Sequence, residues 1–250
     1  MKVEFSIIGK HEQADIIADE FFYDDKYLSG RFAQFVAKNF GIDISALYGK
    51  TQDERRKIVL DTISPQYDAK LGEMKSKIKP FQKIWNGNEK IINDEFIRIF
   101  GSNAQTRICK AKIALGRPEP RFYSDWSFLV SSEKLPALAL DNCIHEITHF
   151  LWFDKFKLVF PNWKPSDFCA PSVPWLLSEI AVDPIVKSGK FKNLTREKCA
   201  YEYFYDETIQ GRNLIECFRE LYAENSPDDF MRKGLEILKK EKELTKRLLK

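Results

Sequence analysis

The sequence predicts an α+β fold that is mostly helical, with a small antiparallel sheet directly before a long apolar helix. Apolar residues recur at helical spacing through residues 10–100. They alternate with polar residues in 107–115 and 121–130, which is typical of strands. Two later segments, 134–154 and 173–187, read as helices that are apolar on most sides, and such helices are usually buried.

Length and composition limit the number of domains and the class of protein. The chain has 250 residues, 44% of them hydrophobic, which is enough for one large domain or two small ones. We expect a mainly helical subdomain at 1–103 and a second region with C-terminal helices at 104–250. Charged residues make up 31% but sum to +3, so charge alone does not indicate a nucleic-acid-binding protein.

The N-terminal region opens with a strand and continues as helices. Residues 1–9 alternate in polarity, and residues 10–40 form apolar helical faces that end well at Gly41. We expect a bend at Asp24 and Asp25, two acids that could bind a cation but are more simply read as surface charge.

A charged helical region follows, with Thr51 as its N-cap. Pro65 and Pro80 are expected to interrupt the helical structure of this region. Residues 81–100 predict one more helix, which we expect to be broken near 86–88. The apolar faces of these helices are typical of packing against a core.

An H-E-x-x-H pattern lies on the helix expected at 134–154, at His145, Glu146 and His149. Residues four apart share one helix face, so the two rings can aim at one point that suits a zinc ion. Glu146 can reach a water on the same metal and take its proton. The alternative is a buried helix whose histidines bond to backbone or carboxylate groups.

A second apolar helix supplies two carboxylates, Glu179 and Asp183, which are four apart and share a face. An ionised carboxylate in apolar surroundings is costly unless it is paired or bound to a metal. We therefore expect Glu179 to be the third zinc ligand. Asp183 would accept a hydrogen bond from the far nitrogen of a ligand histidine, most simply His145.

The H-E-x-x-H pattern followed by E-x-x-x-D on a second helix resembles the gluzincin metallopeptidases, the thermolysin-like and HtpX-like group. The resemblance covers about forty residues, 142–183, and implies a zincin-like catalytic core within 104–250 with zinc as cofactor. Metzincins do not fit, because Trp152 and Lys155 stand where they need Gly and His. The implied roles are zinc ligand for His145, His149 and Glu179, general base for Glu146, and support of a ligand for Asp183.

The sequence departs from thermolysin-like enzymes in having no histidine after His149. Another group would then have to face the developing oxyanion. The candidates are Tyr201, Tyr203, Tyr205 and Arg212. For the tyrosines, the alternative is the edge of an amphipathic helix that packs on the core.

The resemblance also gives residues 121–130 an expected role. In related zincins, a sheet edge beside the zinc pairs with an extended peptide, so this strand would line the substrate cleft. The alternative is an ordinary strand that covers the core. Further on, we expect helices at 195–224 and 226–250, the second opened by Ser226 as N-cap with Pro227 behind it.

The five cysteines are odd in number and show no C-x-x-C spacing, and the N-terminus does not read as an export signal. No apolar run reaches eighteen residues. We therefore expect a soluble, cytoplasmic protein with reduced thiols, unlike the membrane-embedded HtpX-like branch. The basic tail at 239–250 is interspersed with acids, and a solvated helix face explains it better than an anionic partner.

The prediction for function is a zinc-dependent metallopeptidase that acts on a peptide or protein substrate, with no nucleic-acid or membrane partner. Glu146 would activate the zinc-bound water. One alternative is a zincin-like binding or regulatory protein without turnover. A second is a helical nucleic-acid or scaffold module that uses the basic tail.

Overall fold

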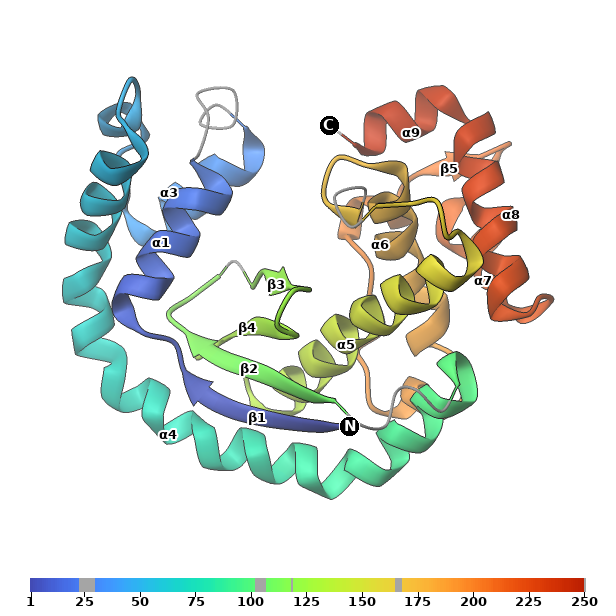
Figure 1. Cartoon of the computed structure of the whole chain (residues 1–250), viewed down its shortest axis with the longest axis horizontal. Coiled ribbons are helices and arrows are strands. Elements are labelled where there is room, and N and C mark those ends of the chain that lie inside the picture. The colour runs from blue at the N-terminus through green and yellow to red at the C-terminus, as the bar shows by residue number, and fades with distance from the viewer. Residues whose placement is uncertain (23–29, 102–106, 118, 165–167, 250) are drawn as a thin grey trace. The chain divides into compact units, whose positions relative to one another are not determined.

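The computed structural model describes residues 1–22, 30–101, 107–117, 119–164 and 168–249. It confirms an α+β fold that is mostly helical (Figure 1). The bend expected at Asp24 and Asp25 lies outside the described residues. The longer elements are β1 Lys2–Ile7, α1 Lys10–Phe21, α3 Arg31–Phe40, α4 Gln52–Phe100, β2 Ile108–Ala114, β3 Arg121–Phe122, β4 Ser127–Ser131, α5 Pro136–Val159, α6 Val173–Val186, β5 Thr208–Ile209, β6 Arg212–Asn213, α7 Leu214–Ala223, α8 Pro227–Lys240 and α9 Lys242–Leu248.

The described residues form two compact units. The first contains Met1–Lys2, Asn86–Ile108 and Leu140–Lys250, and the second contains Val3–Trp85 and Cys109–Ala139. These units group residues that are in contact. They do not test whether the regions before and after residue 103 fold as separate domains, so that division stays a prediction.

The sheet of the second unit is mixed, and the expectation of an antiparallel sheet was wrong. The strand order is β1-β2-β4-β3. β2 runs parallel to β4, with Lys110 opposite Ser127, and β3 runs antiparallel to β4, with Arg121 opposite Phe128. The single strand expected at 121–130 is therefore two strands. They are separated by a turn in which Trp126 has φ 53°, a left-handed conformation that interrupts a strand.

The helix ends of the second unit follow the sequence signals. Gly41 adopts φ 68° and donates its N–H to the carbonyl of Ala37, which closes α3 as expected. At the start of α4, the N–H of Glu54 donates to Oγ1 of Thr51 at 3.3 Å, and the N–H of Thr51 donates to Oε2 of Glu54 at 2.8 Å. This reciprocal capping box confirms Thr51 as the N-cap.

α4 is one continuous helix, so the expected breaks at Pro65, Pro80 and 86–88 were wrong. A proline removes one backbone donor and disfavours the preceding turn, yet packing can override this local preference. Buried side chains with helical spacing continue along one face of α4, before and after each proline and beyond Gly87. They are Val59, Ile63, Tyr67, Met74, Phe81, Trp85, Ile92 and Phe96.

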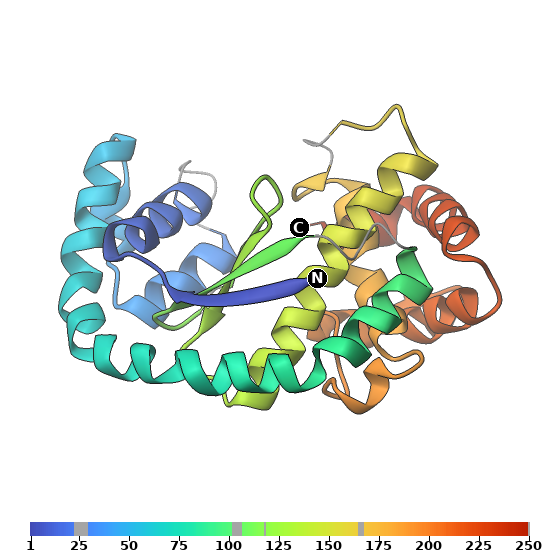
Figure 2. The same cartoon turned by 60° about the horizontal axis from the view of Figure 1, so that its bottom comes forward.

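In the first unit, α6 packs against both α7 and α8 (Figure 1 and Figure 2). α8 approaches α6 closely at Gly234, where a Cβ would lie 2.8 Å from Cδ1 of Leu177 on α6. α6 begins behind Ser172, whose Oγ accepts the N–H of Trp175 at 3.1 Å. Its residues from Leu176 to Val186 are all buried, so its two carboxylates lie inside the unit.

The C-terminal third is more irregular than expected. The helix expected at 195–224 was wrong for its first part, which holds a short 3-10 helix at Glu202–Tyr205 and the hairpin of β5 and β6. The α-helix of this range is α7. The hairpin turn is Gln210-Gly211, with φ 51° and 78°, as a tight two-residue turn requires. Ser226 caps α8 as expected, since its Oγ accepts the N–H of Asp229 at 3.2 Å.

A helix that crosses a bilayer needs about 20 consecutive, mostly apolar residues. Among the residues that the structure describes, none of the helices combines the length and the apolar character needed to cross a membrane.

Candidate metal centre

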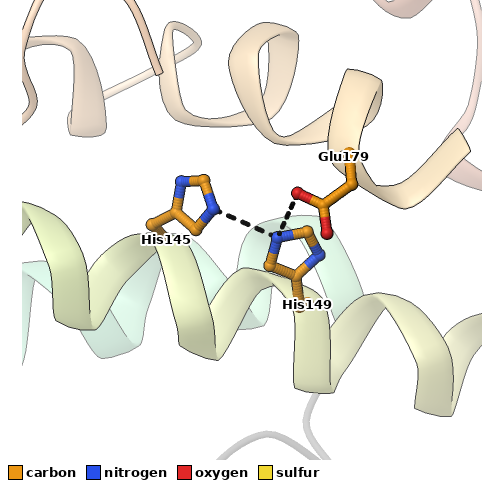
Figure 3. Close-up of side chains that lie close together, drawn as sticks. All are labelled: His145, His149 and Glu179. Atoms are coloured by element: carbon orange, nitrogen blue, oxygen red, sulfur yellow. Dashed lines mark hydrogen bonds and ion pairs between the residues drawn. The ribbon is translucent and has the colours of Figure 1, made fainter. Parts of the chain in front are cut away.

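The two histidines of the motif face each other on successive turns of α5 (Figure 3). Their Nε2 atoms are 3.2 Å apart, and their ring centroids are 4.9 Å apart. His149 is fully buried, and its ring stacks on that of Phe153. Apolar packing therefore restricts the orientation of the His149 ring.

Glu179 on α6 points at the same place (Figure 3). Its Oε2 lies 3.4 Å from Nε2 of His149, and its side chain is 3% exposed. One ligand atom from each of His145, His149 and Glu179 lies within 4.8 Å of the other two. The structure thus brings together the three residues that the sequence indicated as ligands.

These separations fit a small divalent cation. Zinc binds imidazole nitrogen and carboxylate oxygen at about 2.0–2.2 Å, so tetrahedral donor atoms lie about 3.3–3.5 Å from each other. The observed separations are 3.2 Å between the two imidazole nitrogens and 3.4 Å between His149 and Glu179. Two imidazoles and one carboxylate are also a donor set that zinc commonly takes.

The 3.2 Å separation also suits a hydrogen bond between two neutral rings, one donating from Nε2 and the other accepting. The contact between His149 and Glu179 would then be a hydrogen bond or ion pair to a buried carboxylate. A metal and a bonded pair of histidines are thus the two interpretations of this geometry. Metal content distinguishes them.

Glu146 follows His145 directly on α5 and is 6% exposed. Its role as a base that takes a proton from water stays a prediction. The sheet segment 121–130 belongs to the second unit, and its expected role as a wall of the substrate cleft also stays a prediction.

Asp183 is fully buried one turn after Glu179, but its hydrogen bonds differ from those expected. Its Oδ1 accepts from Nε of Arg219 at 2.7 Å. Its Oδ2 accepts from the hydroxyl of Tyr205 and from the N–H of Cys199. Among the described residues, His145 is not one of these donors, so Asp183 contacts other groups than the ring it was expected to support.

The network around Asp183 shifts the pKa of its neighbours. Burial, and then the hydrogen bond to Asp183, raise the pKa of Tyr205 above its usual range. The hydrogen bond to Asp183 raises the pKa of Arg219, which therefore keeps its charge. Burial, and then the nearby charge of Asp141, raise the pKa of the Cys199 thiol to about 11.

Three of the four candidates for facing an oxyanion have other polar partners. Tyr205 donates its hydroxyl to Asp183, and Arg212 pairs with Glu220 on the surface. Tyr203 donates its hydroxyl to the carbonyl of Leu248 at 3.4 Å. Tyr201 is 41% exposed and its ring stacks on that of Tyr203.

Comparison with known protein families, curated proteins and solved structures found no match for this chain. The resemblance to gluzincins therefore depends on the spacing of H-E-x-x-H and E-x-x-x-D and on the geometry of three side chains. Sequence reasoning missed Arg219 as a partner of Asp183, and nothing in its local pattern indicates that contact.

Proposed function

We propose that the protein is a zinc-dependent metallopeptidase of the gluzincin type, with a zincin-like catalytic core. The observation that supports this most is the convergence of His145, His149 and Glu179 from two helices. The donor separations of 3.2 Å and 3.4 Å are close to those expected for ligands around one small cation, and the third pair lies within 4.8 Å.

Each of these side chains has a defined contribution. His145 and His149 would present Nε2 lone pairs, which requires both rings to be neutral at these atoms. Glu179 would add one negative charge, so the site carries net −1 before a divalent cation binds. Burial of Glu179 and His149 excludes water from most of their surface and strengthens their attraction to a cation.

When bound, zinc polarises a substrate carbonyl and lowers the pKa of a bound water toward about 7. Glu146 would accept a proton from the attacking water on one carboxylate oxygen. It would then deliver that proton to the leaving amine. This role is supported by its position in the H-E-x-x-H pattern, directly after His145 on the same helix.

A zincin-like binding protein without turnover is the second candidate. It is favoured by the lack of any histidine after His149 and by the engagement of Tyr205 and Arg212 with other carboxylates. A nucleic-acid module is less well supported. In the basic tail, Lys240 pairs with Glu236 and Arg247 with Glu207, which lowers the charge available to an anionic partner.

Digestion of a peptide library separates the first two candidates. The metallopeptidase should cleave peptides, lose activity with a chelator and regain it with zinc. A zincin-like binding protein would bind zinc in the same assay and leave every peptide intact. The Glu146→Gln variant serves as the control for a contaminating protease, because it should be inactive after the same purification.

A further inference from the structure

Each of the two helices that carry the candidate ligands also carries a buried carboxylate one turn away. Asp141 precedes His145 by four residues on α5, and Asp183 follows Glu179 by four residues on α6. The exposed fractions of Asp141 and Asp183 are 4% and 0%. Buried carboxylates are costly unless their oxygens are satisfied, so their partners show what holds each helix in place.

The partner of Asp141 is Arg196, which lies after α6 in a segment without long helices. Nε of Arg196 is 3.0 Å from Oδ2 of Asp141, and its backbone N–H donates to Oδ1 at 3.3 Å. Side chain and main chain of one residue therefore hold both oxygens. This fixes the position of Arg196 against α5 more tightly than one long side chain would.

The partners of Asp183 come from the same segment. The N–H of Cys199 donates to Oδ2 of Asp183 at 3.3 Å, and the Tyr205 hydroxyl donates to the same oxygen. That hydroxyl also accepts from the N–H groups of Cys199 and Ala200, at 2.8 and 3.2 Å. Tyr205 therefore contacts the backbone of Cys199 and Ala200 at the same place where it bonds to Asp183 of α6.

Two further contacts connect this arrangement to α7 and to the residue that caps it. Nδ2 of Asn213 donates to the carbonyl of Tyr205 at 2.6 Å, and Nε of Arg219 holds the other oxygen of Asp183. The thiol of Cys199 donates to the carbonyl of Arg196 at 3.1 Å. The two ends of the segment are therefore linked, and each binds a different ligand helix.

We propose that residues 196–205, which we term the brace, set the separation of α5 and α6 and so position the metal ligands. Arg196 and Tyr205 are its positioning residues, and neither belongs to the ligand group itself. In many metal sites, a ligand histidine donates its other nitrogen to a carboxylate. Here Asp141 and Asp183 lie one turn away from the ligands. They fix the positions of the two helices and do not hold the histidine rings. The inference rests on the proposed metal site.

The alternative is that these contacts only stabilise the fold. Breaking a buried charge pair destabilises a protein whether or not a metal is near. A purely structural role predicts a lower unfolding temperature with unchanged metal affinity in the protein that remains folded. The brace predicts that metal affinity and ligand geometry change in folded protein.

The test uses cobalt(II) and zinc with the metal-free full chain, at a temperature where circular dichroism shows each variant to be folded. Cobalt(II) absorption reports the geometry of the ligands, and competition with zinc gives the affinity. The variants are Arg196→Gln and Tyr205→Phe, with Arg196→Lys as a conservative rescue. The matched control is Arg212→Gln, which removes an exposed ion pair with Glu220 in the same unit.

We expect zinc affinity to fall about 10- to 100-fold in Arg196→Gln and Tyr205→Phe, the range for residues that support metal ligands. Their cobalt spectra should shift, Arg196→Lys should recover part of the affinity, and Arg212→Gln should match the wild type. Tyr205→Phe removes one hydroxyl, so it keeps the test informative if Arg196→Gln fails to fold.

Wild-type affinity and spectrum in folded Arg196→Gln and Tyr205→Phe would overturn the brace while leaving the metal site intact. If the wild type and Arg212→Gln also bind neither metal, the metal site itself fails, and the brace fails with it. The behaviour of the wild type and the control thus distinguishes the two failures.

Discussion

Oε2 of Glu179 lies 3.4 Å from Nε2 of His149, although the two residues belong to different helices. Both side chains are almost fully buried. This contact turns a motif on one helix into a three-residue donor set, and the proposed function depends on it.

Replacing a ligand should remove the metal. We expect His145→Ala and Glu179→Ala to retain less than a tenth of the metal of the wild type, because two remaining donors bind zinc far more weakly than three. Metal content after dialysis against a metal-free buffer measures this. Glu220→Ala, which alters an exposed carboxylate in the same unit, should retain the full amount; stoichiometric metal in Glu179→Ala would exclude it as a ligand.

Glu146→Gln should keep the metal and the fold but lose hydrolysis. The amide cannot accept the proton of the attacking water, and removing a general base costs about 10²–10⁴-fold in rate. Turnover of a cleaved library peptide, together with metal content, checks both halves of this expectation. Glu236→Gln, at an exposed glutamate of α8, is the control, and unchanged turnover in Glu146→Gln would refute the assignment.

Gly234→Ala should destabilise the first unit. The new Cβ would lie 2.8 Å from Cδ1 of Leu177 and 3.2 Å from Cε1 of Phe218, and overpacking of this kind costs about 1–3 kcal/mol. Helix propensity offsets about 1 kcal/mol of that cost. Denaturant unfolding gives the free energy.

The control for that variant is Gly72→Ala on α4, where a Cβ meets no atom within 4 Å among the described residues. It should be neutral or stabilising by up to about 1 kcal/mol. If Gly234→Ala were as stable as Gly72→Ala, α8 would not approach α6 as closely as the structure shows.

The Cys199 thiol should resist alkylation in the folded protein. Burial raises its pKa to about 11, so the thiol stays protonated at pH 8, and the thiolate is the reactive form. Mass spectrometry after iodoacetamide treatment should find the exposed Cys169 labelled and Cys199 unlabelled until urea is added. Equal labelling of both would mean that residues 196–205 open readily.

The same pKa predicts a loss of stability in alkali. The folded thiol binds its proton more tightly than the unfolded one, so its contribution is fully present below pH 9. That contribution should decline as the pH rises from 9 to about 11. Cys199→Ala should flatten this part of the profile of unfolding free energy against pH.

The meeting of His145, His149 and Glu179 was predictable because it depends on local rules. His145 and His149 are four apart on one helix, and Glu179 is a carboxylate on an otherwise apolar helix. Each of these features can be read from a short stretch of sequence. Both stretches are apolar, so both helices are buried, and burial favours contact between their polar side chains.

Other features depend on contacts between distant segments, and local rules did not find them. α4 continues through Pro65 because its buried face continues, which outweighs one lost backbone donor. Asp183 bonds to Arg219 and Tyr205 because the chain folds back after α6, and no spacing in the sequence marks those partners. The turn at Trp126 likewise divides a segment whose alternation predicts one strand.

Elemental analysis of the purified full chain, before and after incubation with zinc and dialysis, tests the central claim most directly. The account predicts one zinc per chain in the wild type and almost none in His145→Ala and Glu179→Ala. If the wild type holds no zinc after incubation, or if both variants hold as much as the wild type, then the two histidines and Glu179 form a hydrogen-bonded cluster and the proposed function is wrong.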